Sequence, residues 1–354
     1  MAFQNSRRFR VQIPVGPLNY FRCDKMSKVI FIEEKNFGKV EQSMKQFAAD
    51  DFAGKDVLVK LHMGELGNLS FLKPEVVKVF VDALKKFGAN PFLFDTTTRH
   101  PSRCTKEKYY DTAVNKHGFY KVGCEVVIGN EGPKVKVENF EFEIAQEFFD
   151  TKNILVLSHA KGHSFSGFGG AIKNLGMGAT SLKTKMEMHE WSKPVWDRKL
   201  CAKCSSCADV CPLNSIKVGG EWCLDEKKCL GCGKCVATCS YGALKNKADL
   251  QDSLARMAKA SIENKKMLYV NLMIDITKRC DCANNEIFPY EILCDDIGIL
   301  VSDDPVSIDA ASIDLIEQKM KKSFADVWNV DARRQLKKAE ELEMGSMKYE
   351  LVKI

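Results

Sequence analysis

The stretch CAKCSSCADVC at residues 201–211 is matched 28 residues later by CLGCGKCVATC at residues 229–239, and both follow the pattern CxxCxxCxxxC. Two-residue gaps let three thiolates converge from one tight loop on an iron-sulfur cluster, and in two-cluster proteins with this spacing the fourth cysteine ligates the other cluster. The repeat therefore predicts two 4Fe-4S clusters. The expected ligands are Cys201, Cys204, Cys207 and Cys239 for cluster 1, and Cys211, Cys229, Cys232 and Cys235 for cluster 2.

Zinc and disulfides explain this spacing less well. Structural zinc sites present CxxC pairs separated by longer loops, rather than a triplet with a distant fourth ligand. Disulfides would imply an oxidising compartment, which nothing else in the sequence supports. Pro212 follows the first run, as in the bacterial ferredoxin signature, whereas Ser240 follows the second. Because that departure removes no ligand, we expect it to affect the potential of the cluster rather than its presence.

The composition is that of a globular protein. The chain has 354 residues, 45% of them hydrophobic, which is enough for one large domain and a small module. Its 53 basic and 47 acidic residues give a formal net charge of +6, and the basic residues are dispersed, so the sequence offers no support for nucleic-acid binding. No apolar run is long enough to span a membrane, and the first residues lack the apolar core of a signal peptide. With 15 cysteines to be kept reduced, we expect a cytoplasmic protein.

Apolar runs alternate with amphipathic stretches from residue 29 onward. This alternation is typical of an α/β fold in which helices flank a mostly parallel sheet. The expected strands cover residues 29–32, 57–61, 91–94, 126–128, 154–157, 267–276 and 297–301, and the expected helices cover residues 74–87, 106–116 and 249–263, with another beginning at residue 305.

The cysteine repeat interrupts this alternation. We therefore expect a discontinuous α/β domain, residues 29–199 and 247–354, with an inserted α+β module of the bacterial ferredoxin type at residues 200–246. Residues 1–28 form an N-terminal extension that we expect to be poorly ordered. Strands from both sides of the insert would complete one sheet and hold the two ends of the module close together.

One segment outside the repeat concentrates glycines and titratable side chains, HAKGHSFSGFGGAIKNLGMG at residues 159–178. It begins at the carboxyl end of an expected strand, where open α/β sheets place their ligand sites. It contains neither a Walker A loop nor a GxGxxG fingerprint, so it predicts no particular nucleotide.

Lys161, Lys173 and Lys185 are expected to hold an anionic small molecule. The predicted catalytic residues of the segment are Lys161, His163 and Lys173, and the predicted ligand contacts are Gly169, Gly170, Asn174, Gly176, Gly178 and, further on, His189. The alternative is a glycine-rich turn and a helix start with surface lysines.

Two other strand ends carry polar groups, KLHMGE at residues 60–65 and DTTTRH at residues 95–100. If these strands are parallel neighbours, their ends lie at the same edge of the sheet and share the cleft of His163. His62 and Glu65 are therefore added to the predicted catalytic residues. A capping or surface role is the alternative for each of these polar groups taken singly.

Cys280 and Cys282 flank Asp281 just after another expected strand. Such a pair of cysteines binds a further metal or acts as a redox thiol pair in some proteins, and in others each is a small buried apolar residue. These alternatives stay open.

Taken together, the motifs resemble a known family. The motifs are Gly64-Glu65, Asp95-Thr96, His117-Gly118-Phe119, Lys161-Gly162-His163, residues 167–178, His189, the cysteine repeat, Cys280-Asp281-Cys282, Asp296-Ile297-Gly298 and residues 304–309. From about Val29 to the C-terminus, the sequence is similar to iron-sulfur proteins that contain the domain of unknown function 362. The resemblance implies an α/β domain with an inserted double-cluster ferredoxin module, and it favours the glycine-lysine-histidine segment as the working site. It implies no particular reaction.

Two functions fit these expectations. In the first, the protein is a redox enzyme that transfers electrons between the clusters and an anionic substrate or cofactor, while a histidine or Glu65 moves the accompanying proton. In the second, it is a non-catalytic ferredoxin-like carrier or accessory protein that docks a partner oxidoreductase. A redox partner protein is expected in both.

Overall fold

The computed structural model describes residues 10–12, 26–47, 49–283 and 285–354. At its centre lies an eight-stranded sheet in the order β17-β2-β16-β15-β8-β3-β4-β5. Every neighbouring pair is parallel except the two that involve β16. The strands are β2 (Ser27–Glu33), β3 (Asp56–Lys60), β4 (Asn90–Thr96), β5 (Val126–Gly129), β8 (Asn153–His159), β15 (Lys266–Met273), β16 (Gly298–Ser302) and β17 (Tyr349–Lys353).

The predicted α/β fold with a mostly parallel sheet is confirmed, and each expected strand is present. Leu58 and Val156 pack into the core on one face of the sheet, whereas Val57 and Leu155 pack into the core on the other. Strands buried on both faces need apolar residues at successive positions, which is why they are recognisable as continuous apolar runs.

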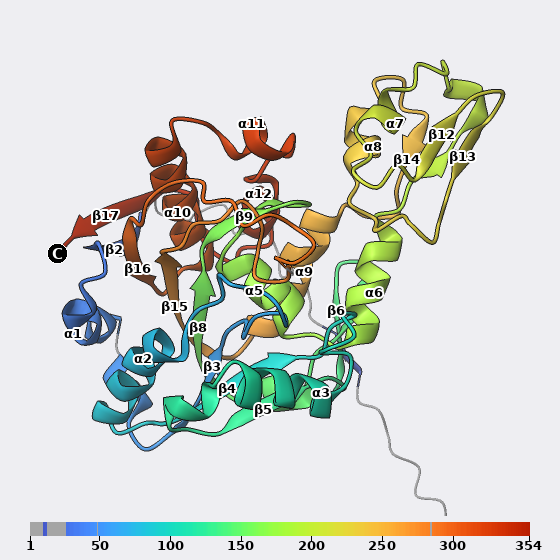
Figure 1. Ribbon diagram of the computed structural model, residues 1–354. Helices are drawn as coiled ribbons and strands as arrows, with labels where there is room; N and C mark the ends of the chain where they lie inside the picture. The colour runs from blue at the N-terminus through green and yellow to red at the C-terminus, as the bar shows by residue number, and fades with distance from the viewer. Residues whose placement is uncertain (1–9, 13–25, 48, 284) are drawn as a thin grey trace, which may run out of the picture.

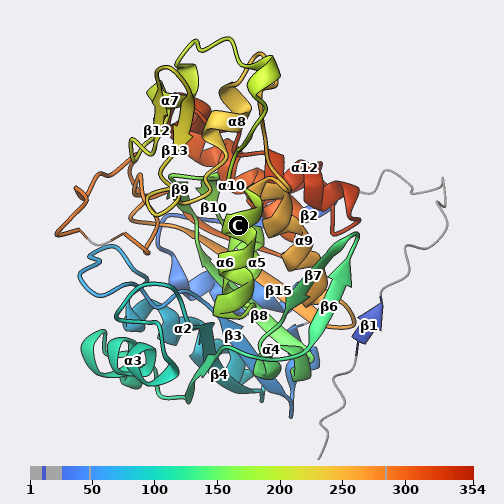
Figure 2. The same cartoon turned by 90° about the vertical axis from the view of Figure 1, so that its right-hand side faces the viewer.

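Helices cover both faces of the sheet (Figure 1). One face carries α1 (Val40–Lys45), α2 (Pro74–Lys86) and α3 (Lys106–Tyr110), and the other carries α5 (Ala171–Gly178), α9 (Leu250–Ile262), α10 (Pro305–Met320) and α12 (Arg334–Glu341). The remaining α-helices outside the cysteine-rich segment are α4 (Gln146–Asp150), α6 (Leu182–Trp191) and α11 (Phe324–Trp328). Figure 2 shows α5 and α6 in front of the sheet, beside α9. None of the described helices is long and apolar enough to cross a membrane.

The expected helices at residues 74–87, 249–263 and from residue 305 correspond to α2, α9 and α10. The expected helix at residues 106–116 is α3 continued by a π-helical turn, Asp111–Lys116. The sequence did not predict the hairpin of β6 (Lys134–Val137) and β7 (Phe140–Glu143), the hairpin of β9 (Lys161–His163) and β10 (Gly167–Gly169), or β17. Most of the predicted N-terminal extension lies outside the described residues, except β1 (Arg10–Gln12), which pairs with β6, and the beginning of β2.

The cysteine-rich segment lies between β8 and β15 in the chain, and these two strands are direct neighbours in the sheet. Its elements are β11 (Val195–Trp196), α7 (Ser206–Asp209), β12 (Ile216–Val218), β13 (Trp222–Leu224), α8 (Lys234–Thr238) and β14 (Leu244–Lys245). β11 pairs with β14, so the two ends of the segment meet. It has a small apolar cluster of its own, formed by Ile216, Cys235 and Leu244. In Figure 1 it projects from the larger body beyond the end of α6.

Asp309 of α10 fixes the start of α5. Its two carboxylate oxygens accept hydrogen bonds from the backbone N–H groups of Ala171 (2.7 Å) and Ile172 (2.9 Å), and Oδ1 also accepts from Asn271 Nδ2 at 2.8 Å. A side chain at Gly170 would place its Cβ 2.2 Å from Asp309 Oδ1. One buried carboxylate therefore joins β15, α10 and the glycine-rich segment, and satisfies two helix N–H groups that would otherwise lack partners.

We expect Asp309→Ala to lower the free energy of unfolding by about 2–4 kcal/mol, because it leaves two helix N–H groups buried without an acceptor and removes one of the two acceptors of the Asn271 amide. Urea unfolding followed by circular dichroism measures this change. As a control, Asp82→Ala removes a carboxylate whose ion pair with Lys78 is solvent-exposed, and we expect it to cost no more than about 0.5 kcal/mol. Equal losses in the two variants would contradict the anchoring role of Asp309.

Candidate functional site

A cavity of about 340 Å³ lies at the carboxyl ends of β3, β4 and β8, where Lys60, Asp95 and His159 end their strands or lie close to the end. Strand ends that the sequence placed at one edge of the sheet therefore do share one cavity. Of the predicted site residues, those that line it are His62, Glu65, Lys161, His163, Gly169, Gly170, Lys173, Asn174, Gly178, Lys185, His189, Cys229, Cys280 and Cys282. Gly176 is not part of the lining.

Two lysines that line the cavity wall, Lys60 and Lys185, donate all three of their ammonium hydrogens to other groups of the protein. Lys60 Nζ donates to Asp95 Oδ1 (2.9 Å), Asn174 Oδ1 (2.8 Å) and its neighbour's carbonyl. Lys185 Nζ donates to Thr96 Oγ1 (2.7 Å) and to the carbonyls of Thr96 (3.3 Å) and Thr97 (2.5 Å). An ammonium has three N–H donors, so neither lysine has one left for a ligand.

Lys161, a predicted catalytic residue, is buried in an ion pair. Its Nζ lies 2.8 Å from Asp281 Oδ1, and His159 Nδ1 lies 2.8 Å from the other oxygen of the same carboxylate. Burial alone would raise the pKa of Asp281, but the charges of His159 and Lys161 outweigh it and lower that pKa far below its ordinary value. The geometry thus gives Lys161 a role in anchoring the loop after β15.

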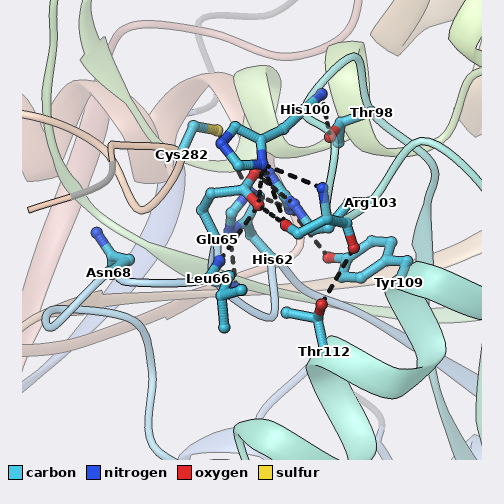
Figure 3. A network of polar contacts seen from close by, with 12 residues as sticks. His62, Glu65, Leu66, Asn68, Thr98, His100, Arg103, Tyr109, Thr112 and Cys282 are labelled. Carbon is cyan, nitrogen blue, oxygen red and sulfur yellow. Dashed lines mark hydrogen bonds and ion pairs between the residues drawn. The ribbon is translucent and has the colours of Figure 1, made fainter. Parts of the chain in front are cut away.

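Glu65 is equally occupied, as Figure 3 shows. Its Oε2 accepts from Arg103 Nε at 2.7 Å, and its Oε1 contacts His100 Nδ1 at 2.7 Å and the Ser102 hydroxyl. Arg103 Nη1 in turn lies 2.9 Å from His62 Nε2. Glu65 and Arg103 are both buried. Since both carboxylate oxygens have charged or hydroxyl partners, Glu65 positions Arg103 and His62 rather than offering a free base.

Lys173 differs from the other lysines of the wall. Within the described part of the chain it makes no hydrogen bond or ion pair, although it lies one residue before Asn174 on α5 and lines the cavity. The lining contains seven lysine or arginine side chains and only four carboxylates. Three of those carboxylates are paired with Lys60, Arg103 and Lys161, so the unpaired Lys173 favours a negatively charged occupant.

His163 and His189 present complementary ring nitrogens to the cavity. His163 Nδ1 accepts from the N–H groups of Phe165 (3.3 Å) and Ser166 (3.2 Å), which leaves the ring proton on Nε2. His189 Nδ1 lies 2.8 Å from the carbonyl oxygen of Leu230, so there the proton is on Nδ1 and Nε2 is an acceptor. Burial lowers the pKa of both rings, well below its ordinary value for His163. Both are neutral at pH 7.

Several glycines of the predicted ligand segment have a packing explanation. A Cβ at Gly178 would lie 2.2 Å from Lys60 Nζ, and a Cβ at Gly176 would lie 2.6 Å from the backbone oxygen of Leu254 on α9. Gly169 is the exception: only the flexible Lys173 side chain comes close to it, and it lines the cavity. Ligand contacts of these glycines stay a prediction.

The eight cysteines of the repeat line two hollows in the cysteine-rich segment. Cys201, Cys204, Cys207 and Cys239 line one, together with Trp196 and Trp222, and Cys211, Cys229, Cys232 and Cys235 line the other. The grouping coincides with the crossed sets expected from the sequence. None of the described cysteines forms a disulfide. Among the described residues, no three His, Cys, Asp or Glu side chains stand close enough together to hold one metal ion.

The cysteine-rich segment also forms part of the cavity wall. Cys229 and Leu230 line the cavity, and Cys229 lines one of the two cysteine hollows as well. His189 of α6 holds this loop through its hydrogen bond to Leu230. A Cβ at Gly231 would lie 1.9 Å from the carbonyl oxygen of His189, so only glycine permits this approach of the two segments.

Comparison with known proteins identifies the family. A family model described as "Domain of unknown function (DUF362)" matches residues 57–314, more than half of the chain. The chain belongs to the DUF362 family. Among solved structures, the lactate racemase apoprotein from Thermoanaerobacterium thermosaccharolyticum is similar with a TM-score of 0.34 and 14% sequence identity, over 74% of this chain and 55% of that one. The DUF362 chain thus spans about half the length of that protein, and a likeness this weak carries no argument. No curated protein matches the chain.

Sequence reasoning assigned no role to four side chains that organise the DUF362 cavity, although it placed the stretches that contain Lys60 and Asp95 at the same edge of the sheet. They are Lys60, Asp95, Arg103 and Tyr109, which contact one another in the buried wall. Lys60 and Asp95 could have been recognised from the sequence, because a charged residue at the end of an apolar strand that is buried on both faces must have a partner of opposite charge or a hydrogen-bonding partner. Arg103 lies in an irregular loop and Tyr109 in the short helix α3 that follows it. Neither residue belongs to a sequence pattern that indicates its role.

Lys185 predicts a pH dependence of stability. Burial, opposed by Asp95 and reinforced by Lys60, lowers its pKa from 10.5 to about 7. Between these values the unfolded chain binds more protons than the folded chain, so the free energy of unfolding rises with pH, by at most about 1.4 kcal/mol per pH unit from this one group. We expect Lys185→Met to flatten that rise in urea titrations at pH 7–10, whereas Lys183→Met, at an exposed position of the same helix, keeps it. Identical slopes in the two variants would be incompatible with a depressed pKa at Lys185.

Proposed function

We propose that this DUF362 protein binds two 4Fe-4S clusters in a ferredoxin-type module and is an oxidoreductase that exchanges electrons with an anionic small molecule in the cavity. The observation that carries the proposal is the position of Cys229, which lines both a four-cysteine hollow and the cavity. Cluster 1 would be held by Cys201, Cys204, Cys207 and Cys239, and cluster 2 by Cys211, Cys229, Cys232 and Cys235. When bound, the clusters would supply one-electron transfer between the outer surface of the module and the cavity.

The donor set around the hollows supports iron-sulfur ligation. Each hollow offers four thiols and a largely apolar surrounding, which suits a cluster with four thiolate ligands. Cys211 Sγ accepts a hydrogen bond from the backbone N–H of Ser215 at 3.2 Å. The indole Nε1 of Trp196 is buried without a hydrogen-bond partner among the described residues, and it belongs to the lining of the other hollow. A buried N–H needs an acceptor, and sulfide or thiolate sulfur would provide one.

Four side chains that line the cavity would bind the anion and hold the protons of the site. Lys173, without a partner among the described residues, binds the anion. His163, neutral and protonated at Nε2, donates a hydrogen bond to it, while His189 offers an acceptor at Nε2. Burial lowers the pKa of Lys185 to about 7, so its charge changes near neutral pH and contributes to the proton balance of the site.

A second candidate function is a carrier that docks a partner oxidoreductase and turns over no ligand. Exposed side chains of the module favour such docking, because Val195 (67% exposed), Tyr241 (54%) and Leu200 (46%) present apolar surface and Cys204 of the same segment is exposed. Apolar groups of this size at a surface are a common feature of protein contacts. The two functions differ in whether the cavity is occupied.

Anaerobic purification should yield about eight iron and eight sulfide per chain, with an electron paramagnetic resonance signal after reduction. We expect Cys204→Ser to lower the iron content to about half, because it removes one cluster 1 ligand. Cys223→Ser is the matched control, since Cys223 lies in the same module on β13 but outside both sets, and it should keep the full content. A colourless or zinc-loaded wild-type protein would refute cluster binding.

The cavity ligand is tested separately by mass spectrometry of the small molecules that the purified protein releases on denaturation. We expect an anionic molecule from the wild type and at least about tenfold less from Lys173→Met, because tenfold corresponds to about 1.4 kcal/mol, a modest contribution for one ion pair out of bulk water. Lys183→Met controls for a change of surface charge. If the wild type retains no anion while its clusters are intact, the carrier function is favoured over the enzyme.

A further inference from the structure

Cys280 and Cys282 lie in a turn that the structure holds firmly against the cavity. The N–H of Ala283 donates to the carbonyl oxygen of Cys280 at 2.9 Å, which closes the turn. Between the two cysteines, Asp281 points inward to Lys161 and His159, and it also accepts from the Ser70 hydroxyl at 3.0 Å. Residues two apart in such a turn lie at roughly the 4.4–6.8 Å Cα separation that a disulfide requires. Both thiols line the cavity.

The two thiols have different surroundings. Cys282 is exposed, and its Sγ lies 3.3 Å from His62 Nε2, as Figure 3 shows. Arg103 Nη1 lies 2.9 Å from the same ring nitrogen and brings a fixed positive charge to this side of the cavity. Cys280 has no such neighbour among its recorded contacts and is the less exposed of the two. A thiol beside an imidazole and a guanidinium is the one that ionises first.

The acidities of the pair agree with this geometry. A hydrogen bond from the Cys280 thiol lowers the pKa of Cys282, and the charges of His62 and Lys173 add to the lowering. The same hydrogen bond and burial raise the pKa of Cys280. Cys282 is therefore the more acidic thiol of the pair, and Cys280 the less acidic one.

We propose that Cys280 and Cys282 are a redox dithiol, with Cys282 as the attacking thiolate and Cys280 as the resolving thiol, and that the cavity admits an anionic low-molecular-weight disulfide as their substrate. The Cys282 sulfur attacks one sulfur of the substrate, whose S–S bond breaks, and the first thiolate leaves. Cys280 then gives up its proton and attacks the Cys282 sulfur, which releases the second thiolate. The protein is oxidised by two electrons to the Cys280–Cys282 disulfide, and the substrate is reduced to two thiols, one of which takes up the proton released by Cys280 and the other a proton from solvent.

The charge preference of the substrate follows from Lys173. It is a cation of the lining without a hydrogen-bonding or ion-pairing partner among the described residues, and its charge acts on Cys282. A carboxylate-bearing disulfide would therefore be drawn to the thiolate, whereas an uncharged one would gain nothing from this lysine. The dithiol assignment rests on the cavity alone and does not require that clusters bind.

The experiment uses the anaerobically purified protein and glutathione disulfide. After incubation, acid quenching, alkylation and digestion, mass spectrometry quantifies the peptide that contains both cysteines. We expect the internal disulfide to accumulate in the wild type as the ratio of glutathione disulfide to glutathione rises. Cys280→Ser should trap glutathione on Cys282 at least about tenfold faster than Cys282→Ser traps it on Cys280, because only Cys282 is activated.

Two controls sharpen the outcome. Cys223→Ser removes an exposed thiol elsewhere and should leave the reaction unchanged. Lys173→Met should slow the reaction with glutathione disulfide about tenfold but not that with uncharged 2-hydroxyethyl disulfide. Equal trapping on the two cysteines, or no internal disulfide at any glutathione ratio, would overturn the dithiol assignment, and equal slowing with both disulfides would overturn the anionic substrate. Iron is measured in the same samples. If the clusters are absent while the thiol reaction is intact, the result contradicts the proposed cluster-dependent function but not the dithiol assignment.

Discussion

The burial of charge at the carboxyl edge of the sheet is the constraint on which the site depends. Lys60 ends a doubly buried strand, and an unpaired ammonium there would be very costly. Asp95 from the next strand and Asn174 from α5 both bind it, and Gly178 leaves the space that it occupies. The Nζ atom of Lys60 thereby holds β3, β4 and α5 together. Because Asn174 is held, the neighbouring Lys173 keeps its place in the cavity wall. Of the described lysines that line the cavity, the one without a partner thus owes its position to Lys60, which is fully paired.

Much of the fold was predictable because its strands are buried on both faces. Val57, Leu58 and Val59 are all inaccessible to solvent, and such runs are recognisable without knowledge of their partners. The edge strand β17, Tyr-Glu-Leu-Val-Lys, has only half-buried or exposed residues and therefore resembles a loop. The hairpin of β6 and β7 is short and carries lysines and glutamates in alternation, so its apolar positions gave too weak a pattern.

The sequence predicted where the site lies, but not which role each of its residues has. Parallel strands put His62, Asp95 and His163 at one edge by topology alone, and the structure brings them to one cavity. Which lysine is free could not be inferred, because the partners that occupy Lys161 and Lys185 are Asp281, more than a hundred residues away, and backbone carbonyls. The glycines posed the same difficulty: the carboxylate that explains Gly170 belongs to Asp309 on a distant helix.

The position of β2 in the sheet bears on how the protein is made. Both of its neighbours, β16 and β17, come from the last sixth of the chain. During translation, β2 therefore has no partner strand until almost the whole polypeptide has left the ribosome. The cysteine-rich segment, in contrast, is closed by contacts within itself, such as β11 with β14. These contacts span a much shorter length of chain than those of β2, and contacts between residues closer in sequence form earlier. The segment can thus fold on the nascent chain while the sheet beneath it is still unfinished.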